Sequence, residues 1–448
     1  MNNRLKFFYR GFMFLLLIRT SLHGELLNLD LQKACDIALQ NNPGVKLARE
    51  GVQKSEERVR EARGGLLPTL SGFSQYQHAW ELPTFVMNFP DPLTGQTKVL
   101  KIKMGQENTI AYGFSFSQPV YLGGTLQNAY RLSRLGVNIS KVQLKITEQK
   151  VVNEVTNAYY GLLFARSASE VTAEGLNSAQ ENLAQVRKFF DVGRASRFDV
   201  LRAEVQVANY QPMVVTARNA VRLAESALRM ALGIADEIEL NITEKLQYAT
   251  TDYSNKALDE LLIIALRERP ELGLLAQQKQ IADRQIALSK ASTKPSLLFG
   301  SNYQFQGQRD DLKFVSDDFF KSFSSSFSLN VPLFAGFTNK AKIQQAKIAR
   351  KEVDLQQESL INAIKLEVKS SYFSMKEADE NVKSQLKTID QAQEALRLAQ
   401  IMYSEGASTQ LDVLNANLAV NQAKMNYQKS LYEYNVALAN LKKAINQL

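Results

Sequence analysis

The sequence predicts a mainly α-helical protein of duplicated architecture that also carries transmembrane β-strands. Three observations predict this fold class. Motifs of the first half recur in the second, four segments alternate in hydrophobicity with period two, and proline is scarce. No proline follows Pro332 in a chain of 448 residues, and an interior proline costs a helix about 3 kcal/mol. Very long helices are therefore expected.

The duplication is visible as motifs that recur at a constant spacing. Two prolines of the first half recur 227 residues later, and a segment that contains a glycine and an aspartate recurs after 213 residues. Internal repetition over so much of a chain indicates a repeated structural unit. The matching pairs are Pro43 and Pro270, Pro68 and Pro295, and the segments 191–201 and 404–414.

These matches set the expected domain boundaries. Residues 1–24 have the basic residues, short apolar run and small residues of a secretory signal peptide. The apolar run is shorter than the roughly 18–20 residues that a membrane-spanning helix needs. The remaining segments are a first repeat at 25–240 with a β-hairpin at about 70–118, a linker at 241–256, and a second repeat at 257–448 with a β-hairpin at about 297–331.

Long helices are expected over about 125–190 and 338–403. Apolar residues recur there at the helical spacings of three and four, and roughly 65 residues form a helix about 100 Å long. Small residues such as Ala346 and Ala419 would let one helix pack against two neighbours. This favours a ring of helices, although an antiparallel coiled coil fits the periodicity nearly as well.

Four segments of about 10–12 residues alternate between apolar and polar residues, as strands with two different faces do. Strands of this length cross an outer membrane when tilted, with aromatic residues toward lipid and small polar residues toward water. A soluble, half-buried hairpin fits the alternation equally well. The aromatic residues expected at the membrane are Trp80, Tyr112, Phe114, Phe116, Phe299, Tyr303, Phe305, Phe323 and Phe327.

The connection between the first two strands, about residues 81–107, is longer than its counterpart in the second repeat. It contains Pro83, Pro90, Pro92 and Gly95, which are residues typical of turns and loops. We expect a loop on the outer side of the membrane, where transmembrane barrels carry their longer loops.

The composition excludes several classes of function. With one cysteine and two histidines, the chain can form neither an internal disulfide nor a zinc site of four Cys or His ligands. It lacks the phosphate-binding loop, dinucleotide-binding and HExxH motifs, so we expect no enzyme activity, no cofactor and no metal. The net charge of +9 falls to about +5 without the signal peptide, and no basic block indicates nucleic acid as a partner.

The number of strands bears on assembly. Four strands cannot close a transmembrane barrel, because the smallest such barrels have about eight. Open strand edges are costly in lipid, since each unsatisfied backbone group costs several kcal/mol there. If the strands lie in a membrane, several chains must therefore assemble. The competing hypothesis is a periplasmic coiled-coil scaffold or adaptor without a channel.

The chain resembles the TolC family of outer-membrane efflux proteins along essentially its whole mature length. The resemblance rests on the duplicated half with one hairpin, the prolines at the strand ends, and a glycine followed six residues later by an aspartate, as in Gly193 with Asp199 and Gly406 with Asp412. It implies a homotrimer in which twelve strands form one outer-membrane barrel and twelve helices continue it into the periplasm. The linker would lie in an equatorial belt around the helices.

The resemblance also implies a function. Family members are passive exit ducts of tripartite efflux pumps and type I secretion systems in the outer membrane of Gram-negative bacteria. The implied cargo is drugs, other small toxic compounds or secreted polypeptides. The implied partners are a periplasmic membrane-fusion adaptor and an inner-membrane transporter of the RND, ABC or MFS type, with outer-membrane lipid around the barrel.

The resemblance places a gate at the periplasmic helix tips, and the residues expected to form it are Asp199, Tyr403, Asp412 and Asn415. Asp412 takes the place of a constriction aspartate, and Asn415, one turn on, stands where the family often has a second acid. A ring of identical acids attracts cations and resists closing because like charges repel. With Asn415 in the second position, the preference for cations should be mild.

Family members also have a tyrosine–arginine latch between the helix pairs at the tips. Tyr403 keeps the tyrosine, whereas Ser408 occupies the place of the arginine. A substitute charge pair would have to come from nearby residues. The candidates are Arg194 and Arg197 as cations, with Asp199 or Glu405 as the acid.

The tip residues also have purely structural interpretations. Asp199 and Asp412 suit a helix N-cap or first turn, where the helix dipole favours an acid. Gly193 and Gly406 suit helix termination in a left-handed conformation, and small-residue tips would also let an adaptor hairpin dock. The tip residues expected to contact the adaptor are Gly193, Arg194, Ser196, Gly406, Ser408 and Thr409.

Overall fold

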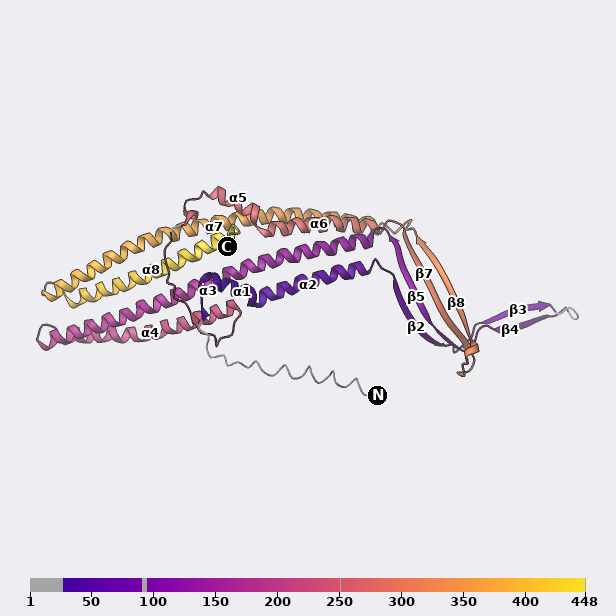
Figure 1. The fold of residues 1–448 in the computed structure, drawn as a ribbon, viewed down its shortest axis with the longest axis horizontal. Coiled ribbons are helices and arrows are strands. Elements are labelled where there is room, and N and C mark those ends of the chain that lie inside the picture. Colours follow the sequence, from indigo (N-terminus) through magenta and orange to yellow (C-terminus); the bar gives the residue numbers. More distant parts are fainter. Residues whose placement is uncertain (1–26, 91–94, 250, 448) are drawn as a thin grey trace, which may run out of the picture. The chain divides into compact units, whose positions relative to one another are not determined.

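The computed structural model describes residues 27–90, 95–249 and 251–447 (Figure 1). The expected signal peptide, residues 1–24, lies outside the described residues. The chain forms two compact units. The first comprises the chain up to Glu50, Val142–Gly273 and Glu358 onward; the second comprises Gly51–Lys141 and Leu274–Gln357.

The second unit contains a four-stranded antiparallel sheet in the order β2-β5-β7-β8. All four strands predicted from the alternation are present, and they are 10, 15, 14 and 12 residues long. Each hairpin of the duplicated halves contributes two neighbouring strands. The strands are β2 (Thr69–His78), β5 (Asn108–Leu122), β7 (Ser296–Arg309) and β8 (Phe319–Asn330).

The register of the sheet places the aromatic residues on one face. Tyr112 pairs with Phe305, and their rings stack with centroids 5.3 Å apart. Phe323 and Phe327 of β8 are 72% and 73% exposed on this face. Four serines of β8 occupy the alternate positions and therefore the opposite face, because neighbouring residues of a strand point to opposite sides. They are Ser322, Ser324, Ser326 and Ser328. The two-faced sheet predicted from period-two alternation is thus confirmed.

Trp80, which the alternation groups with the aromatic residues of the strands, lies outside the sheet. β2 ends at His78, and Trp80 lies two residues beyond that end. Its side chain is 90% exposed and meets the His78 ring edge-on, with centroids 4.5 Å apart. The Ala79 amide still donates its hydrogen to the carbonyl of Glu107 at 2.7 Å, and the residues after Ala79 enter the insertion.

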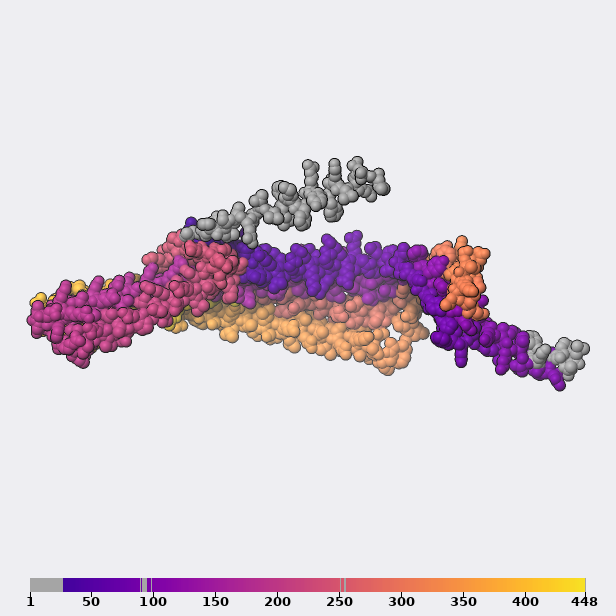
Figure 2. Space-filling view, turned by 90° about the horizontal axis from the view of Figure 1, so that it is seen from below, coloured from indigo at the N-terminus to yellow at the C-terminus, as the bar shows by residue number. Residues whose placement is uncertain are grey.

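The insertion at 81–107 is a β-hairpin, so the prediction of a loop was wrong. β3 (Thr84–Pro90) pairs with β4 (Thr97–Lys103), and this pair hydrogen-bonds to no other described strand. Pro83 precedes β3 and Pro90 ends it, positions where the missing amide hydrogen costs no ladder bond. In the space-filling view the hairpin stands clear of the other strands of its unit (Figure 2).

The two longest helices match the proline-free stretches of the sequence. α3 spans Thr125–Asp191 and α7 spans Thr338–Ser404, against predicted limits of 125–190 and 338–403. Within the described part of the chain, no helix is both long and apolar enough to cross a membrane. The other α-helices are α1 (Leu31–Asn41), α2 (Pro43–Gly64), α4 (Arg197–Leu232), α5 (Leu258–Glu268), α6 (Pro270–Ala291) and α8 (Gln410–Ala444).

The hydrophobic core of the first unit lies where α1, α3, α4, α5, α7 and α8 meet. Tyr159, Leu228 and Tyr434 are completely buried there. A short parallel pair, β1 (Leu27–Asn28) with β6 (Leu240–Asn241), joins the start of the described chain to the segment after α4. Apolar side chains from distant parts of the chain therefore share one core.

The linker predicted at 241–256 packs against this core. Ile242 and Leu246 are buried. The Tyr248 hydroxyl donates to Asp379 Oδ1 at 2.7 Å, and the Tyr434 hydroxyl donates to the carbonyl of Ala249 at 2.7 Å. These contacts fix the linker to α7 and α8, because buried polar groups retain their hydrogen bonds.

Candidate functional site

The two helical hairpins, α3 with α4 and α7 with α8, end in turns of the same geometry. Gly193 and Gly406 have φ angles of +77° and +79°. This left-handed conformation terminates a helix and suits glycine because a Cβ would be strained there. The predicted role of both glycines as helix terminators is confirmed. The amide hydrogen bonds are also the same: Gly193 to Phe190 at 2.9 Å and Arg194 to Phe189 at 2.7 Å, with Gly406 to Tyr403 at 3.1 Å and Ala407 to Met402 at 2.7 Å.

Each turn is followed by a capping box. In the second repeat, the Thr409 hydroxyl accepts from the Asp412 amide at 3.3 Å. Asp412 Oδ2 in return accepts from the Thr409 amide at 2.8 Å and from the Thr409 hydroxyl at 2.6 Å. Ser196 and Asp199 form the same box at the start of α4. The interpretation of both aspartates as first-turn acids is therefore confirmed.

These hydrogen bonds favour the charged form of both aspartates. The hydroxyl of Thr409, and then its amide, lower the pKa of Asp412 below its ordinary value. The hydroxyl of Ser196 lowers the pKa of Asp199 in the same way. Both carboxyls are therefore ionised at neutral pH, because accepting hydrogen bonds stabilises a carboxylate.

The two turns contact each other through aromatic rings and one arginine. The Phe189 ring of α3 meets the Tyr403 ring of α7 edge-on, with centroids 5.5 Å apart. The Arg194 guanidinium lies 5.3 Å from the Phe189 ring centroid, and Arg194 Nη2 donates to the carbonyl of Ser404 at 3.0 Å. Ser404 ends α7, and a cation at a helix C-terminus is favoured by the helix dipole.

The charges of Asp199 and Arg194 both act on the Tyr403 hydroxyl at this contact. Burial, and then the negative charge of Asp199, raise the pKa of Tyr403, while Arg194 acts in the opposite direction. Ser408, at the arginine's place, donates its hydroxyl to the carbonyl of Ala399 at 3.3 Å and so bonds within its own hairpin. Of the two predicted latch cations, Arg194 hydrogen-bonds to the other turn in the described part of the chain.

Asp412 and Asn415 lie one turn apart on the exposed side of α8. Leu411 and Leu418 of the same helix are each 41% exposed. This helix side has no covering element within the part of the chain that the structure describes. The gate role of Asp412 and Asn415 stays a prediction.

Sequence reasoning missed three residues at the tips. Phe189 and Ser404 make the contact between the turns, and no local pattern signals it. Gln410, the first residue of α8, is only 3% exposed, yet neither atom of its side-chain amide has a hydrogen-bond partner within the described chain. Its counterpart in the first repeat is Arg197. An alignment of the two repeats shows this replacement of a charged residue by a neutral one and could have drawn attention to Gln410.

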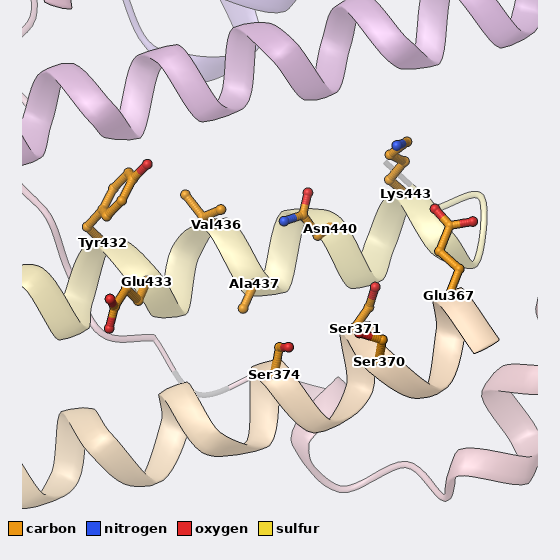
Figure 3. A pocket seen from close by; sticks show the side chains of 10 residues that line it. All are labelled: Glu367, Ser370, Ser371, Ser374, Tyr432, Glu433, Val436, Ala437, Asn440 and Lys443. Atoms are coloured by element: carbon orange, nitrogen blue, oxygen red, sulfur yellow. The ribbon is translucent and has the colours of Figure 1, made fainter. Parts of the chain in front are cut away.

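A cavity of about 400 Å³ lies farther along the second hairpin, between α7 and α8 (Figure 3). Small side chains of α7, including Ser370 and Ser374, leave this space open opposite Ala437. Glu367 at its edge is held by Arg269, with 2.6 Å between Oε2 and Nη1. Glu433, Asn440 and Lys443 complete the polar part of its lining.

Comparison with known proteins identifies what this arrangement is similar to. The family described as "Outer membrane efflux protein" matches residues 34–234 and 261–447. The chain is 23% identical over 350 residues to the outer membrane protein TolC of Vibrio cholerae, covering 77% of this chain and 78% of that protein. It is 22% identical over 435 residues to the alkaline protease secretion protein AprF of Pseudomonas aeruginosa, covering 96% of this chain and 86% of that protein.

Solved structures of outer membrane channels are similar to this structure as well. The structure is similar to that of the Campylobacter jejuni CmeC outer membrane channel, with a TM-score of 0.77 at 18% identity, covering 93% of this chain and 85% of that one. The Neisseria gonorrhoeae MtrE outer membrane channel matches with a TM-score of 0.71 at 21% identity, over 93% and 88% of the two chains. At such identities the similarity shows the fold.

Proposed function

The chain belongs to the outer membrane efflux protein family, and from this premise we propose that it is the trimeric exit duct of a tripartite efflux pump or type I secretion system. Membership of this family makes it an outer-membrane protein of a channel family. One structural observation supports the proposal most strongly. The four-stranded sheet has an exposed aromatic face and two edges, β2 and β8, that pair with no other described strand.

Three copies would remove the unpaired edges. β8 of one copy would pair with β2 of the next, and twelve strands would close a barrel with the aromatic face toward lipid. Open edges cannot persist in lipid, where unsatisfied backbone groups cost several kcal/mol each. Aromatic side chains, Trp80 included, would contact the membrane and its interfaces. The linker at 241–256 would belong to an equatorial belt around the helices.

The tips would form the periplasmic gate. Three copies of Asp412 would give a ring of negative charge, with Asn415 adding a neutral second ring. The contact of Arg194 with Ser404 and of Phe189 with Tyr403 would latch the two hairpins of each chain in the closed state. The same turns would receive a periplasmic adaptor, because their glycines and small side chains leave room for a partner helix.

The duct would be passive and would depend on partners for energy. An inner-membrane transporter of the RND, ABC or MFS type would drive cargo into it through the adaptor. AprF is named for secretion of an alkaline protease, and SrpC of Pseudomonas putida is named for solvent efflux. The cargo class proposed for this chain accordingly covers secreted polypeptides and small toxic compounds. Family membership favours this proposal over a periplasmic scaffold without a channel.

Single-channel recording in planar bilayers tests the proposal. Detergent-extracted protein, cross-linked to fix its oligomer, should give discrete conductance steps from a species of three chains. Asp412→Asn removes the charge but keeps an oxygen that can cap α8, so it should lower the preference for cations. Asp199→Asn is the matched control, because Asp199 sits in the same capping box of the other repeat.

Two outcomes would contradict the proposal at different levels. A soluble monomer or dimer without conductance would contradict the duct hypothesis and favour the periplasmic scaffold. Equal effects of Asp412→Asn and Asp199→Asn on ion selectivity would leave the duct intact but remove the special role of Asp412.

A further inference from the structure

A pocket of about 300 Å³ in the second unit is lined by three arginines. It lies between α3 and α6. α3 supplies two guanidinium groups and α6 supplies the third, so the cations come from segments far apart in the sequence. Its lining residues are Arg131, Arg134, Leu135, Asn138, Gln280 and Arg284.

The three arginines have no acidic partner within residues 27–90, 95–249 and 251–447. Two carboxylates of the same unit, Asp283 and Asp354, are engaged by other cations. Asp283, beside Arg284 in sequence, accepts from Arg350 Nε at 2.9 Å. Asp354 lies 2.6 Å from Arg350 and 2.8 Å from Lys279, and these bonds lower the pKa of Asp354 to about 2.

The sequence of α3 makes the local excess of positive charge larger. Between Thr125 and Thr147 this helix contains arginines and lysines but no acidic residue. The nearest of these lysines, Lys141, faces Glu56 of α2 at 3.8 Å, so that carboxylate is also taken. Like charges that share a pocket repel one another, and a bound anion would remove that repulsion.

We propose that this pocket binds the phosphate group of an anionic ligand. Guanidinium groups match phosphate oxygens with paired hydrogen bonds and stay charged at all physiological pH values. The side-chain amides of Asn138 and Gln280 add further donors, and Leu135 provides an apolar wall beside the phosphate. The side chains of Arg131, Arg134 and Arg284 are exposed, so a ligand reaches them without any rearrangement.

The position of the pocket identifies two sources of such a phosphate. α3 begins at Thr125, three residues after β5 ends at Leu122. At 1.5 Å per residue, Arg131 and Arg134 lie about 9–14 Å along the helix from its start. If the sheet spans the membrane, as the proposed function requires, a phospholipid headgroup at the periplasmic surface is one source. A phosphate-bearing solute is the other.

Binding of defined probes to the full-length protein in detergent tests the pocket. Calorimetric titration with inorganic pyrophosphate measures the solute arm. Native mass spectrometry with phosphatidylglycerol, against phosphatidylcholine of equal chain length, measures the lipid arm. The test variant is Arg131→Gln with Arg284→Gln. The control is Arg218→Gln with Arg222→Gln, which removes two exposed arginines of α4.

We expect the test variant to bind the preferred probe at least about tenfold more weakly, since hydrogen bonds to charged groups are among the strong ones. The control should stay within about twofold, the change expected for a surface residue remote from a site. Preferential retention of phosphatidylglycerol assigns the site to lipid, and binding of pyrophosphate without it assigns the site to a solute. Binding of neither probe, or equal binding by both variants, would overturn the proposal.

The oligomeric state of the same samples tests whether a second copy of the chain occupies the pocket instead. A carboxylate of a second copy could fill the pocket, and then the test variant would weaken the oligomer while the wild type bound neither probe. That result also counts against the proposal. Conductance recorded on the same preparations separates the two hypotheses, because a channel without phosphate binding would leave the duct standing and remove only the pocket.

Discussion

Arg194 is the residue that joins the two turns of the chain. Its hydrogen bond to the Ser404 carbonyl and its position over Phe189 hold one hairpin to the other. Arg194→Ala should shift the tips toward an open state by about 0.5–1 kcal/mol, because the lost hydrogen bond is exposed. Single-channel recording should show a two- to fivefold higher open-to-closed ratio, on the scale of about tenfold per 1.4 kcal/mol.

Arg197→Ala is the control for this prediction. It removes the same charge from the same turn at the first residue of α4. If it opened the channel as much as Arg194→Ala, then charge in general, and not the contact with Ser404, would hold the turns together.

Gln410 carries a buried side-chain amide that has no hydrogen-bond partner among residues 27–90, 95–249 and 251–447. Leaving such a group unpaired costs about 1–3 kcal/mol. Gln410→Leu should therefore stabilise the tip conformation seen here and raise the thermal midpoint by a few degrees, measured by circular dichroism in detergent. Gln422→Leu is the matched control, because Gln422 is an exposed glutamine of the same helix that already bonds Asn426 at 2.8 Å. A lower midpoint for Gln410→Leu would mean that the assembled protein supplies a partner.

The capping aspartates predict how the tips respond to acid. Hydrogen bonds hold the pKa of Asp199 and of Asp412 below the ordinary value near 3.8. Their contribution to helix capping is therefore complete above that value and is lost as the pH falls through the lowered folded-state values. Limited proteolysis at the tips should be unchanged between about pH 8 and 5 and should increase only below about pH 4. The Asp199→Asn, Asp412→Asn double variant should lack that acid transition.

At the residue scale, the sequence allowed the turns to be predicted but not their mutual contact. A glycine followed by a hydroxyl residue and an aspartate is a local signal, so Gly193 and the capping boxes could be expected. The pairing of Phe189 with Tyr403 joins two separate turns, and local patterns carry no information about it. For the same reason the burial of Gln410 was invisible in the sequence.

The β3–β4 hairpin is the element whose role is easiest to isolate. It pairs only with itself within the described strands, while β2 and β5 remain in register from Thr69 with Ser117 to His78 with Asn108. Replacing residues 81–105 by a two-residue Asn-Gly turn would join Trp80 to Gln106 and keep the register of His78 with Asn108. It should therefore leave sheet, assembly and conductance unchanged, because that turn suits a two-residue hairpin connection. Loss of the cross-linked trimer in the shortened protein would show that the hairpin takes part in assembly.

At the element scale, the sequence was most informative where physical constraints are simple. Absence of proline over long stretches predicted α3 and α7 to within one residue at their ends, and strict alternation predicted the four long strands. The insertion was misjudged because Pro83 and Pro90 lie at strand ends, where proline is harmless, and because β3 and β4 are short. Trp80 was misplaced because the same alternation gives no signal for where a ladder stops.

At the scale of the whole chain, the linker is tied down by polar contacts that only the fold reveals. Burial disfavours the ionised form of Asp379, but hydrogen bonds from Lys383 and Tyr248 outweigh it, so the pKa of Asp379 lies below its ordinary value. Burial and the bond to Asp379 raise the pKa of Tyr248 to about 12. Tyr248→Phe leaves part of the Asp379 carboxylate unpaired and should cost about 1–3 kcal/mol.

Thermal unfolding and proteolysis within 241–256 measure this effect. Tyr253→Phe is the control, since the Tyr253 hydroxyl bonds Gln447 in an exposed position. Equal losses in both variants would mean that the linker is held by its apolar residues and not by the bond to Asp379.

The duplication of the chain was predictable from repeated motifs, whereas three-fold assembly rests on the unpaired edges and stays a prediction.

The near identity of the two turns, together with Arg194 in only one of them, has a consequence for symmetry. A duct built from six identical half-length chains would place every substitution at all six turns, so a donor turn and an acceptor turn could never differ. A duplicated gene lifts this restriction, because each half evolves separately while the backbone geometry is kept. Ala407 stands where the first repeat has Arg194. In the proposed trimer, donor and acceptor turns would alternate around the axis, giving the closed state three directional bonds.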